Sequence, residues 1–192
     1  MGSSQSGKSY FVKSFLAAMP RSEKVFIWDP NDEYSKPWAP KKKALDVDRH
    51  ESFMDFWEQR QRGEARDRAT FAGCRGDEFD ALFAYAWCVS RCTVVLDEFH
   101  LAMRGGSVSP TVEDSIARGR HRGIHYVFVT QNPQYVPTRL YNNAHEIVCF
   151  RLNEANAIDK LRSAYGDRAE LAQLGSLEVG KCVRINNRST AS

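Results

Sequence analysis

The chain opens with MGSSQSGKS (residues 1–9), and Gly2 to Ser9 of this stretch match the P-loop pattern G-x-x-x-x-G-K-S. In such a loop, successive backbone N–H groups and the start of the following helix surround phosphate oxygens. A lysine at the place of Lys8 reaches the β- and γ-phosphates, and the Ser9 hydroxyl coordinates Mg²⁺. We therefore expect ATP and Mg²⁺ as cofactors. The residues expected to contact the nucleotide are Gly2, Ser3, Ser4, Gln5, Ser6, Gly7, Lys8, Ser9 and Tyr10.

A P-loop needs a strand before it and a helix after it. The helix is predicted over Lys8 to Met19, with an apolar face of Phe11, Phe15, Leu16 and Met19. Only Met1 precedes the loop. In P-loop folds the missing strand lies inside the parallel sheet, where its neighbours need its hydrogen bonds. We expect Met1 to be an internal methionine and an apolar strand to be encoded upstream of it.

The composition is that of a globular protein: 192 residues, 42% hydrophobic and 27% charged. This length predicts one domain, over residues 1–188, with a frayed tail at 189–192. A net charge of +3 is too small to indicate nucleic-acid binding by itself. Five cysteines without a C-x-x-C pair indicate reduced thiols rather than a zinc site or disulfides. No stretch approaches the ~18 apolar residues of a membrane span.

Strand-like and helix-like segments alternate along the chain, which predicts a three-layer α/β domain with a mostly parallel sheet. The expected strands are Lys24–Trp28, Arg68–Ala72, Thr93–Leu96, Ile124–Thr130, Glu146–Leu152 and Lys181–Ile185. The expected helices, besides the first, are Ser52–Arg62, a helix capped by Asp77, Thr111–Arg118, Glu154–Tyr165 and Arg168–Leu174. Loops are expected at Ser35–Lys43 and Leu101–Pro110.

Two carboxylates follow the apolar strand Thr93–Leu96, in the arrangement of a Walker B motif. The carboxyl ends of parallel strands form the ligand crevice of such sheets. Asp97 is expected to hold Mg²⁺ through water, together with Ser9. Glu98 is expected to polarise the water that attacks the γ-phosphate, which favours a hydrolytic ATPase. The alternative is a strand that ends in exposed acids, and the P-loop upstream argues against it.

A third polar element follows the strand that ends near Thr130. Gln131 could read the γ-phosphate or position water, or it could simply mark a strand-to-loop transition. His100 follows the two acids and could sense the nucleotide, but we assign it to packing. The loop with Gly105-Gly106 is a candidate for DNA contact, or it is disordered without a role.

Together these elements resemble the FtsK–HerA superfamily of DNA-pumping ATPases, over the stretch from Gly2 to about Arg188. The resemblance rests on five motifs, which are the P-loop, Asp29-Pro30 with Glu33-Tyr34, Asp97-Glu98, Arg118-Gly119-Arg120-His121, and Thr130-Gln131 with Pro133. Within the superfamily the chain looks most like the genome-packaging ATPases of membrane-containing icosahedral viruses.

The resemblance implies a RecA-like P-loop NTPase that hydrolyses ATP and moves double-stranded DNA through a homo-oligomeric ring, a hexamer. It implies capsid or portal-vertex proteins as partners, and the cytoplasm of an infected host cell or the virion as location. It places Asp29 and Glu33 near the nucleotide and makes Gln131 the sensor. Arg120, and after it Arg118, is implied as an arginine finger acting on a neighbouring subunit. A solvated basic helix end is the alternative for both arginines.

Two rival functions stay open. One is a filamentous-phage assembly ATPase of the zonula-occludens-toxin type, which exports single-stranded DNA and usually carries a membrane span. The other is a scaffold module that binds ATP without turning it over, and Glu98 argues against it.

Overall fold

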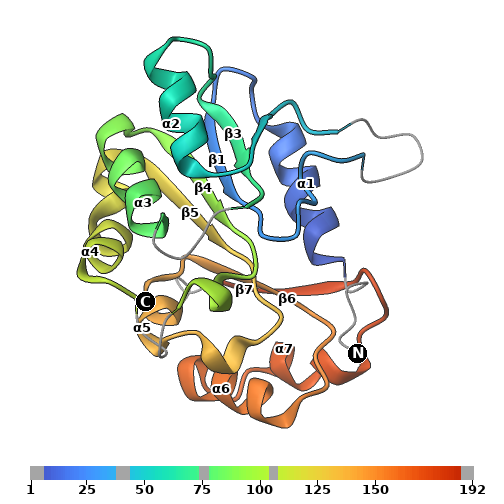
Figure 1. Ribbon diagram of the computed structural model, residues 1–192. Coiled ribbons are helices and arrows are strands. Elements are labelled where there is room, and N and C mark those ends of the chain that lie inside the picture. Colours follow the sequence, from blue (N-terminus) through green and yellow to red (C-terminus); the bar gives the residue numbers. More distant parts are fainter. Residues whose placement is uncertain (1–6, 38–43, 74–77, 104–107, 187–192) are drawn as a thin grey trace. The chain divides into compact units, whose positions relative to one another are not determined.

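The computed structural model describes residues 7–37, 44–73, 78–103 and 108–186. The expectations for Gly2–Ser6, Lys41–Lys43, Cys74, Asp77, Gly105-Gly106 and the tail lie outside these residues. The chain forms two compact units, one of residues 12–130 and one of residues 1–11 with 131–192. Each unit is described by itself below, and Figure 1 labels the elements.

Residues 12–130 are built on a parallel sheet of five strands in the order β2-β3-β1-β4-β5. The strands are β1 (Lys24–Trp28), β2 (Asp48–His50), β3 (Arg68–Phe71), β4 (Cys92–Leu96) and β5 (Ile124–Phe128). Every residue of β3 and β4 is buried, as expected of parallel strands covered on both faces. The prediction of a mostly parallel α/β sheet is confirmed. Here β2 and β5 are the edge strands, and an upstream strand stays a prediction.

Helices cover both faces of this sheet, with α1 on one side and α3 and α4 on the other (Figure 1). They are α1 (Lys8–Ala18), α2 (Phe53–Gln61), α3 (Phe79–Val89) and α4 (Pro110–Arg118), with 3₁₀ turns η1 (Phe99–Ala102) and η2 (Gly119–Arg122). An aromatic cluster forms much of the core, in which Phe26, Phe56 and Tyr85 meet edge to face.

The predicted apolar face of α1 is confirmed at Leu16 and wrong at Phe15. Phe15 is 45% exposed, whereas Val12 and Leu16 are buried. Positions 12 and 16 share a face at a period of 3.6 residues, and position 15 lies about 100° round the axis from 16. Lys13 is buried instead, with its ammonium 5.4 Å from the centre of the Tyr34 ring.

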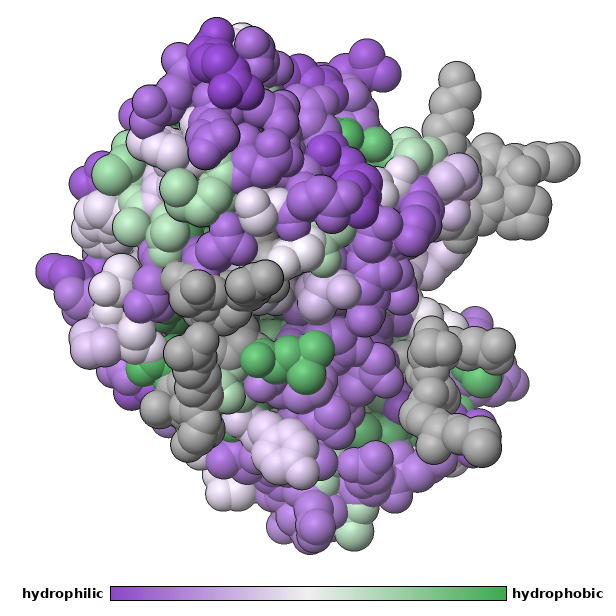
Figure 2. Space-filling view, viewed as in Figure 1, coloured by the Kyte–Doolittle hydropathy of each residue, from purple (hydrophilic) through white to green (hydrophobic). Residues whose placement is uncertain are grey.

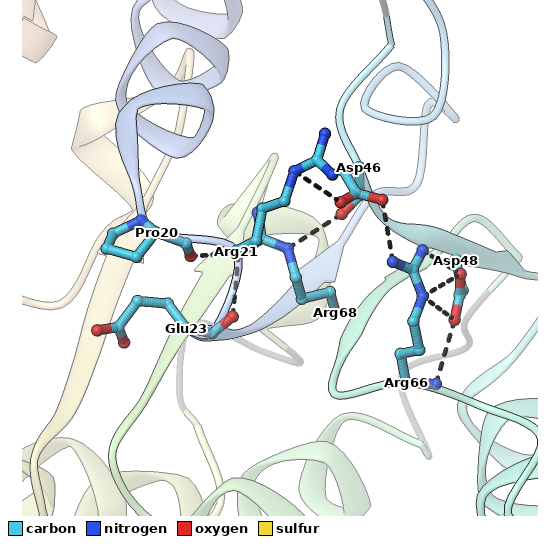
Figure 3. Close-up of polar contacts among 7 residues, drawn as sticks. All are labelled: Pro20, Arg21, Glu23, Asp46, Asp48, Arg66 and Arg68. Atoms are coloured by element: carbon cyan, nitrogen blue, oxygen red, sulfur yellow. Dashed lines mark hydrogen bonds and ion pairs between the residues drawn. The ribbon is translucent and has the colours of Figure 1, made fainter.

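Arginines tie the strands together at the edge of the sheet where β1 and β3 begin (Figure 3). The buried Arg68 guanidinium donates to the backbone oxygens of Pro20 (3.2 Å), Glu23 (2.9 Å) and Asp46 (3.0 Å). Arg66, which is half exposed, forms ion pairs with Asp46 and Asp48. The two arginines thus join the end of α1 to the starts of β1, β2 and β3.

The other unit holds an antiparallel pair, β6 (Glu146–Phe150) and β7 (Cys182–Asn186). Its helices are α5 (Thr138–Asn143), α6 (Ala155–Tyr165) and α7 (Ala169–Ala172), with turns η3 (Pro133–Tyr135) and η4 (Leu174–Ser176). Glu146–Leu152 was expected as a buried strand, but Glu146 is exposed because β6 has a single neighbour among the described strands. The short elements β2 and α5 are missing from the prediction, since neither is long enough to show a period.

The described cysteines are free thiols, and two of them, Cys92 and Cys149, are buried. Among the helices that the structure describes, none combines the length and the apolar character that crossing a membrane requires. The face seen in Figure 2 is mainly hydrophilic, and apolar residues reach it in small groups.

Candidate functional site

Three buried acids follow β1 and β4 at the carboxyl edge of the parallel sheet. Trp28 and Leu96 are register partners, so Asp29 and Asp97 leave neighbouring strands side by side. The Asp97 amide donates to the Trp28 oxygen at 3.0 Å. Asp29, Asp97 and Glu98 are 0%, 3% and 7% exposed. Acids that follow two neighbouring strands therefore lie together at this edge of the sheet, within residues 12–130.

Asp29 organises the loop that follows β1. Its Oδ1 accepts from the Glu33 amide at 2.9 Å, and its Oδ2 accepts from the Tyr34 amide at 2.8 Å and the Thr70 hydroxyl at 3.2 Å. Burial raises the pKa of Asp29, and these three hydrogen bonds oppose the rise. Both oxygens accept hydrogen bonds from the protein, so Asp29 shapes the loop beside the site. Glu33 is half-buried in the same loop.

Asp97 has one carboxylate oxygen available. Its Oδ1 accepts from the Glu98 amide at 3.0 Å, and within the described residues Oδ2 accepts no hydrogen bond. Burial, helped by the charges of Glu98, Glu33 and Asp29, raises the pKa of Asp97 to about 7. A buried carboxylate oxygen among like charges fits Mg²⁺, which prefers hard oxygen ligands and takes few from the protein. No metal-holding group of three or more His, Cys, Asp or Glu occurs in the described ranges, so nucleotide and water would complete the shell.

Glu98 stands in a left-handed backbone conformation, with φ 45° and ψ 44°. Its Oε2 lies 3.4 Å from Nδ1 of His100, and the same nitrogen lies 3.3 Å from the Thr130 hydroxyl. A non-glycine residue in this region costs about 1–2 kcal/mol. The assignment of His100 to packing missed this contact. The short spacing between Glu98 and His100 in the sequence Asp-Glu-x-His is the signal from which this contact could have been predicted.

Tyr34 adds an unpartnered polar atom close to these acids. Its side chain is fully buried, and its hydroxyl has no hydrogen-bond partner among the described residues. Burial, together with the negative charges of Asp97 and Asp29, raises the pKa of Tyr34 far above its usual range. A hydroxyl left unsatisfied in this way fits a site whose water or ligand supplies the partner.

The described part of the P-loop belongs to the other compact unit. Gly7 has φ +95°, and a Cβ there would lie 3.1 Å from the Gly180 Cα and 3.2 Å from a Phe150 ring carbon. Only glycine suits this position. α1 begins at Lys8, and the Phe11 amide donates to the Gly7 oxygen at 2.9 Å. Lys8 and Ser9 are half-buried and Tyr10 is 53% exposed.

The candidate arginines lie at the other end of β5. η2 ends one residue before Gly123, and β5 runs from Ile124 to Phe128. Arg118 forms an ion pair with Asp114 and lies over the Trp87 ring. Arg120 is exposed, and its side chain makes no hydrogen bond or ion pair with any described residue, although its backbone oxygen accepts from the Gly123 amide. Since four steps of a parallel strand rise about 13 Å, Arg120 is far from Glu98 of its own chain. Gln131 follows Thr130 in the chain and belongs to the other unit.

A parallel five-stranded sheet with helices on both faces gives this chain an α/β fold that matches the fold of solved P-loop NTPases. The genome packaging NTPase B204 from Sulfolobus turreted icosahedral virus 2, in complex with AMP, is similar at TM-score 0.74 and 18% identity, over 99% of this chain and 92% of that chain. Its complex with ATP-gammaS gives TM-score 0.72 and 20% identity, over 99% and 91%. B204, the DNA-packaging ATPase from Sulfolobus Turreted Icosahedral Virus, is similar at TM-score 0.72 and 17% identity, over 99% of this chain and 91% of that chain. The sequence matches no protein-family model and no curated protein.

Proposed function

We propose that this protein hydrolyses ATP and uses the energy to move double-stranded DNA, as the motor subunit of a viral genome-packaging machine. The observation that carries the proposal is the buried pair Asp97-Glu98 at the carboxyl end of β4, in a chain whose α1 opens with a P-loop sequence. The likeness of the fold to solved packaging NTPases supports it.

Each residue has a proposed task. Lys8 places its charge on the β- and γ-phosphates, while Ser9 and Asp97 hold Mg²⁺. Bound Mg²⁺ would neutralise part of the triphosphate charge. Glu98 orients the attacking water and accepts its proton. Gln131 couples the state of the nucleotide to motion. The loop residues from Gly2 to Ser6, with Gly7 and Tyr10, complete nucleotide binding.

The catalytic arginine comes from a neighbouring subunit in this proposal. Arg120 is exposed, its side chain lacks a partner in the described part of the chain, and it lies at the edge of the sheet opposite Glu98. An exposed side chain at this edge suits the proposed role in another copy's site, and the proposed working form is then a ring, taken as a hexamer from the family resemblance. Arg118 is second choice because Asp114 already engages it. Capsid or portal-vertex proteins are the proposed further partners, in the cytoplasm of an infected cell or on the virion.

Steady-state ATP hydrolysis with and without double-stranded DNA, at two salt concentrations, tests the proposal. We expect stimulation by DNA that fades at high salt, because a motor tolerant of every sequence grips phosphates. Glu98→Gln should bind ATP without turning it over, and Lys8→Ala should lose both. A wild type that holds ATP intact for hours would identify a scaffold module. Stimulation by single-stranded DNA alone would identify an export ATPase.

A further inference from the structure

Glu98, the proposed general base, forms a compact polar cluster with His100 and Thr130, and the function proposed above leaves the latter two residues without a task. The Glu98 carboxylate and the Thr130 hydroxyl approach the same atom, Nδ1 of His100, at 3.4 and 3.3 Å. The side chains of His100 and Glu98 are only 17% and 10% exposed. All three residues belong to residues 12–130, so the geometry lies inside one compact unit.

The chemistry of the contact determines which imidazole nitrogen carries the proton. A lone pair on Nδ1 would face a carboxylate and repel it, so Nδ1 carries the hydrogen. The Thr130 Oγ1 lies within hydrogen-bond distance of Nδ1, whereas the Glu98 Oε2 contact at 3.4 Å is electrostatic and lacks the geometry of a hydrogen bond.

Backbone bonds join the same residues to the end of β5. The Phe99 amide donates to the Val129 oxygen at 2.9 Å, and the Val129 amide donates to the Leu96 oxygen at 2.9 Å. The turn that carries Glu98 is therefore held by the residue just before Thr130. Thr130 is followed in the chain by Gln131, the proposed sensor. A shift at the end of β5 would reach the Glu98 carboxylate through His100.

We propose that His100 is a positioning residue that orients the Glu98 carboxylate and couples it to the end of β5 through Thr130. The inference rests on the proposed ATPase function, because it gives His100 a purpose only if Glu98 acts on water. The left-handed backbone of Glu98 strengthens it. A strained catalytic residue keeps its orientation only where its surroundings over-determine it.

The test compares His100→Leu with His100→Asn, whose side-chain amide nitrogen stands where Nδ1 stands in histidine. His100→Leu should lower kcat about tenfold or more and leave KM for ATP within about twofold. His100→Asn should retain most of the rate. Thr130→Val should lower kcat less than His100→Leu does, and adding it to His100→Leu should cause little further loss, since coupled residues are not additive. His145→Leu, at an exposed histidine of the other unit, serves as control and should match wild type.

Three results would overturn the inference. An equal loss of kcat in His100→Asn and His100→Leu would mean that His100 only packs against its neighbours. A rise in KM without a change in kcat would mean the same. Wild-type kcat in His100→Leu would remove any role. These outcomes require that wild type shows turnover that Glu98→Gln abolishes. If it does not, the proposed function fails as well, and the two failures are thus told apart.

Discussion

Glu98 occupies a backbone region that glycine tolerates better than any other residue, with φ 45° and ψ 44°. We therefore expect Glu98→Gly to be more stable than Glu98→Ala by about 1 kcal/mol, although both remove the carboxylate. Urea unfolding of the two variants measures the difference. The same comparison at Ala84, an exposed position inside α3, should have the opposite sign. A Glu98→Ala variant as stable as Glu98→Gly would mean that the turn relaxes without strain.

Asp32 provides a test of pH dependence at the residue scale. Its Oδ1 accepts from Arg49 Nε and from Ser35 Oγ, both at 2.9 Å, and Lys36 lies 3.0 Å from Oδ2. The Arg49 hydrogen bond, opposed by burial and assisted by the Lys36 and Ser35 hydrogen bonds, lowers the pKa of Asp32 from 3.8 to about 2. Because the pKa of Asp32 is lower in the folded state than in the unfolded state, its charge stabilises the folded protein at pH values above the unfolded pKa. This stabilisation is lost as the pH falls through the folded pKa.

Wild type should therefore exceed Asp32→Asn in unfolding free energy at pH 7, by less than about 1 kcal/mol because solvent screens the pair. The difference should shrink below pH 4 and disappear only below about pH 2, where Asp32 is protonated in both states. Denaturant unfolding at several pH values measures it. A difference that stays constant down to pH 2 would show that the asparagine disturbs packing rather than charge.

At the scale of elements, a buried arginine joins segments that are distant in the chain. Arg68→Ala would leave the backbone oxygens of Pro20, Glu23 and Asp46 without their donor. We expect a loss of about 2–4 kcal/mol in unfolding free energy. Arg68→Lys should recover only part of this free energy, because a compact ammonium group cannot reach acceptors in as many directions as a planar guanidinium can.

Arg66→Ala is the matched control, since Arg66 stands two residues away in the same cluster but is half exposed. The Arg66→Ala variant should lose no more than about 1 kcal/mol of unfolding free energy, as is usual when a surface ion pair is removed. Equal losses for the two arginines in urea unfolding would contradict the distinction between a buried donor and an exposed one.

Most element boundaries lie close to those predicted from the sequence patterns. β1, β3, β4 and β5 and the helices α2, α4 and α6 lie within two residues of their predicted ends. β2 and α5 escaped prediction because three and six residues carry no readable period. The pairing of β6 with β7 could not be inferred, because strand order depends on contacts between distant segments.

At the scale of the whole molecule, the proposed ring makes a prediction that one subunit cannot satisfy. Arg120→Ala and Glu98→Gln should each lack ATPase activity. An equal mixture should recover on the order of a quarter of the wild-type rate, because a ring interface can combine an intact Glu98 with a neighbour's intact Arg120. Steady-state hydrolysis after mixing and reassembly measures the recovery.

Arg122→Ala provides the control for this experiment. Arg122 donates to the Trp87 oxygen and the Ser90 hydroxyl, both at 3.0 Å. Its loss should reduce stability rather than supply a defect that mixing can repair. Mixtures of the Arg120 and Glu98 variants that stay inactive would remove the role of Arg120 in the neighbouring site.

The sequence by itself determined the P-loop, the acids after β4 and the alternation that yields a parallel α/β sheet. These signals are local, since each depends on residue types at a short spacing or on one strand's burial. Tertiary structure alone decided that the Asp29 carboxylate accepts hydrogen bonds from the backbone of the loop that follows it, and that Phe15 faces solvent. It also decided that His100 contacts Glu98 and Thr130. Thr130 lies 30 residues beyond His100, and such a contact exists only once β4 and β5 have paired. No sequence spacing records that pairing.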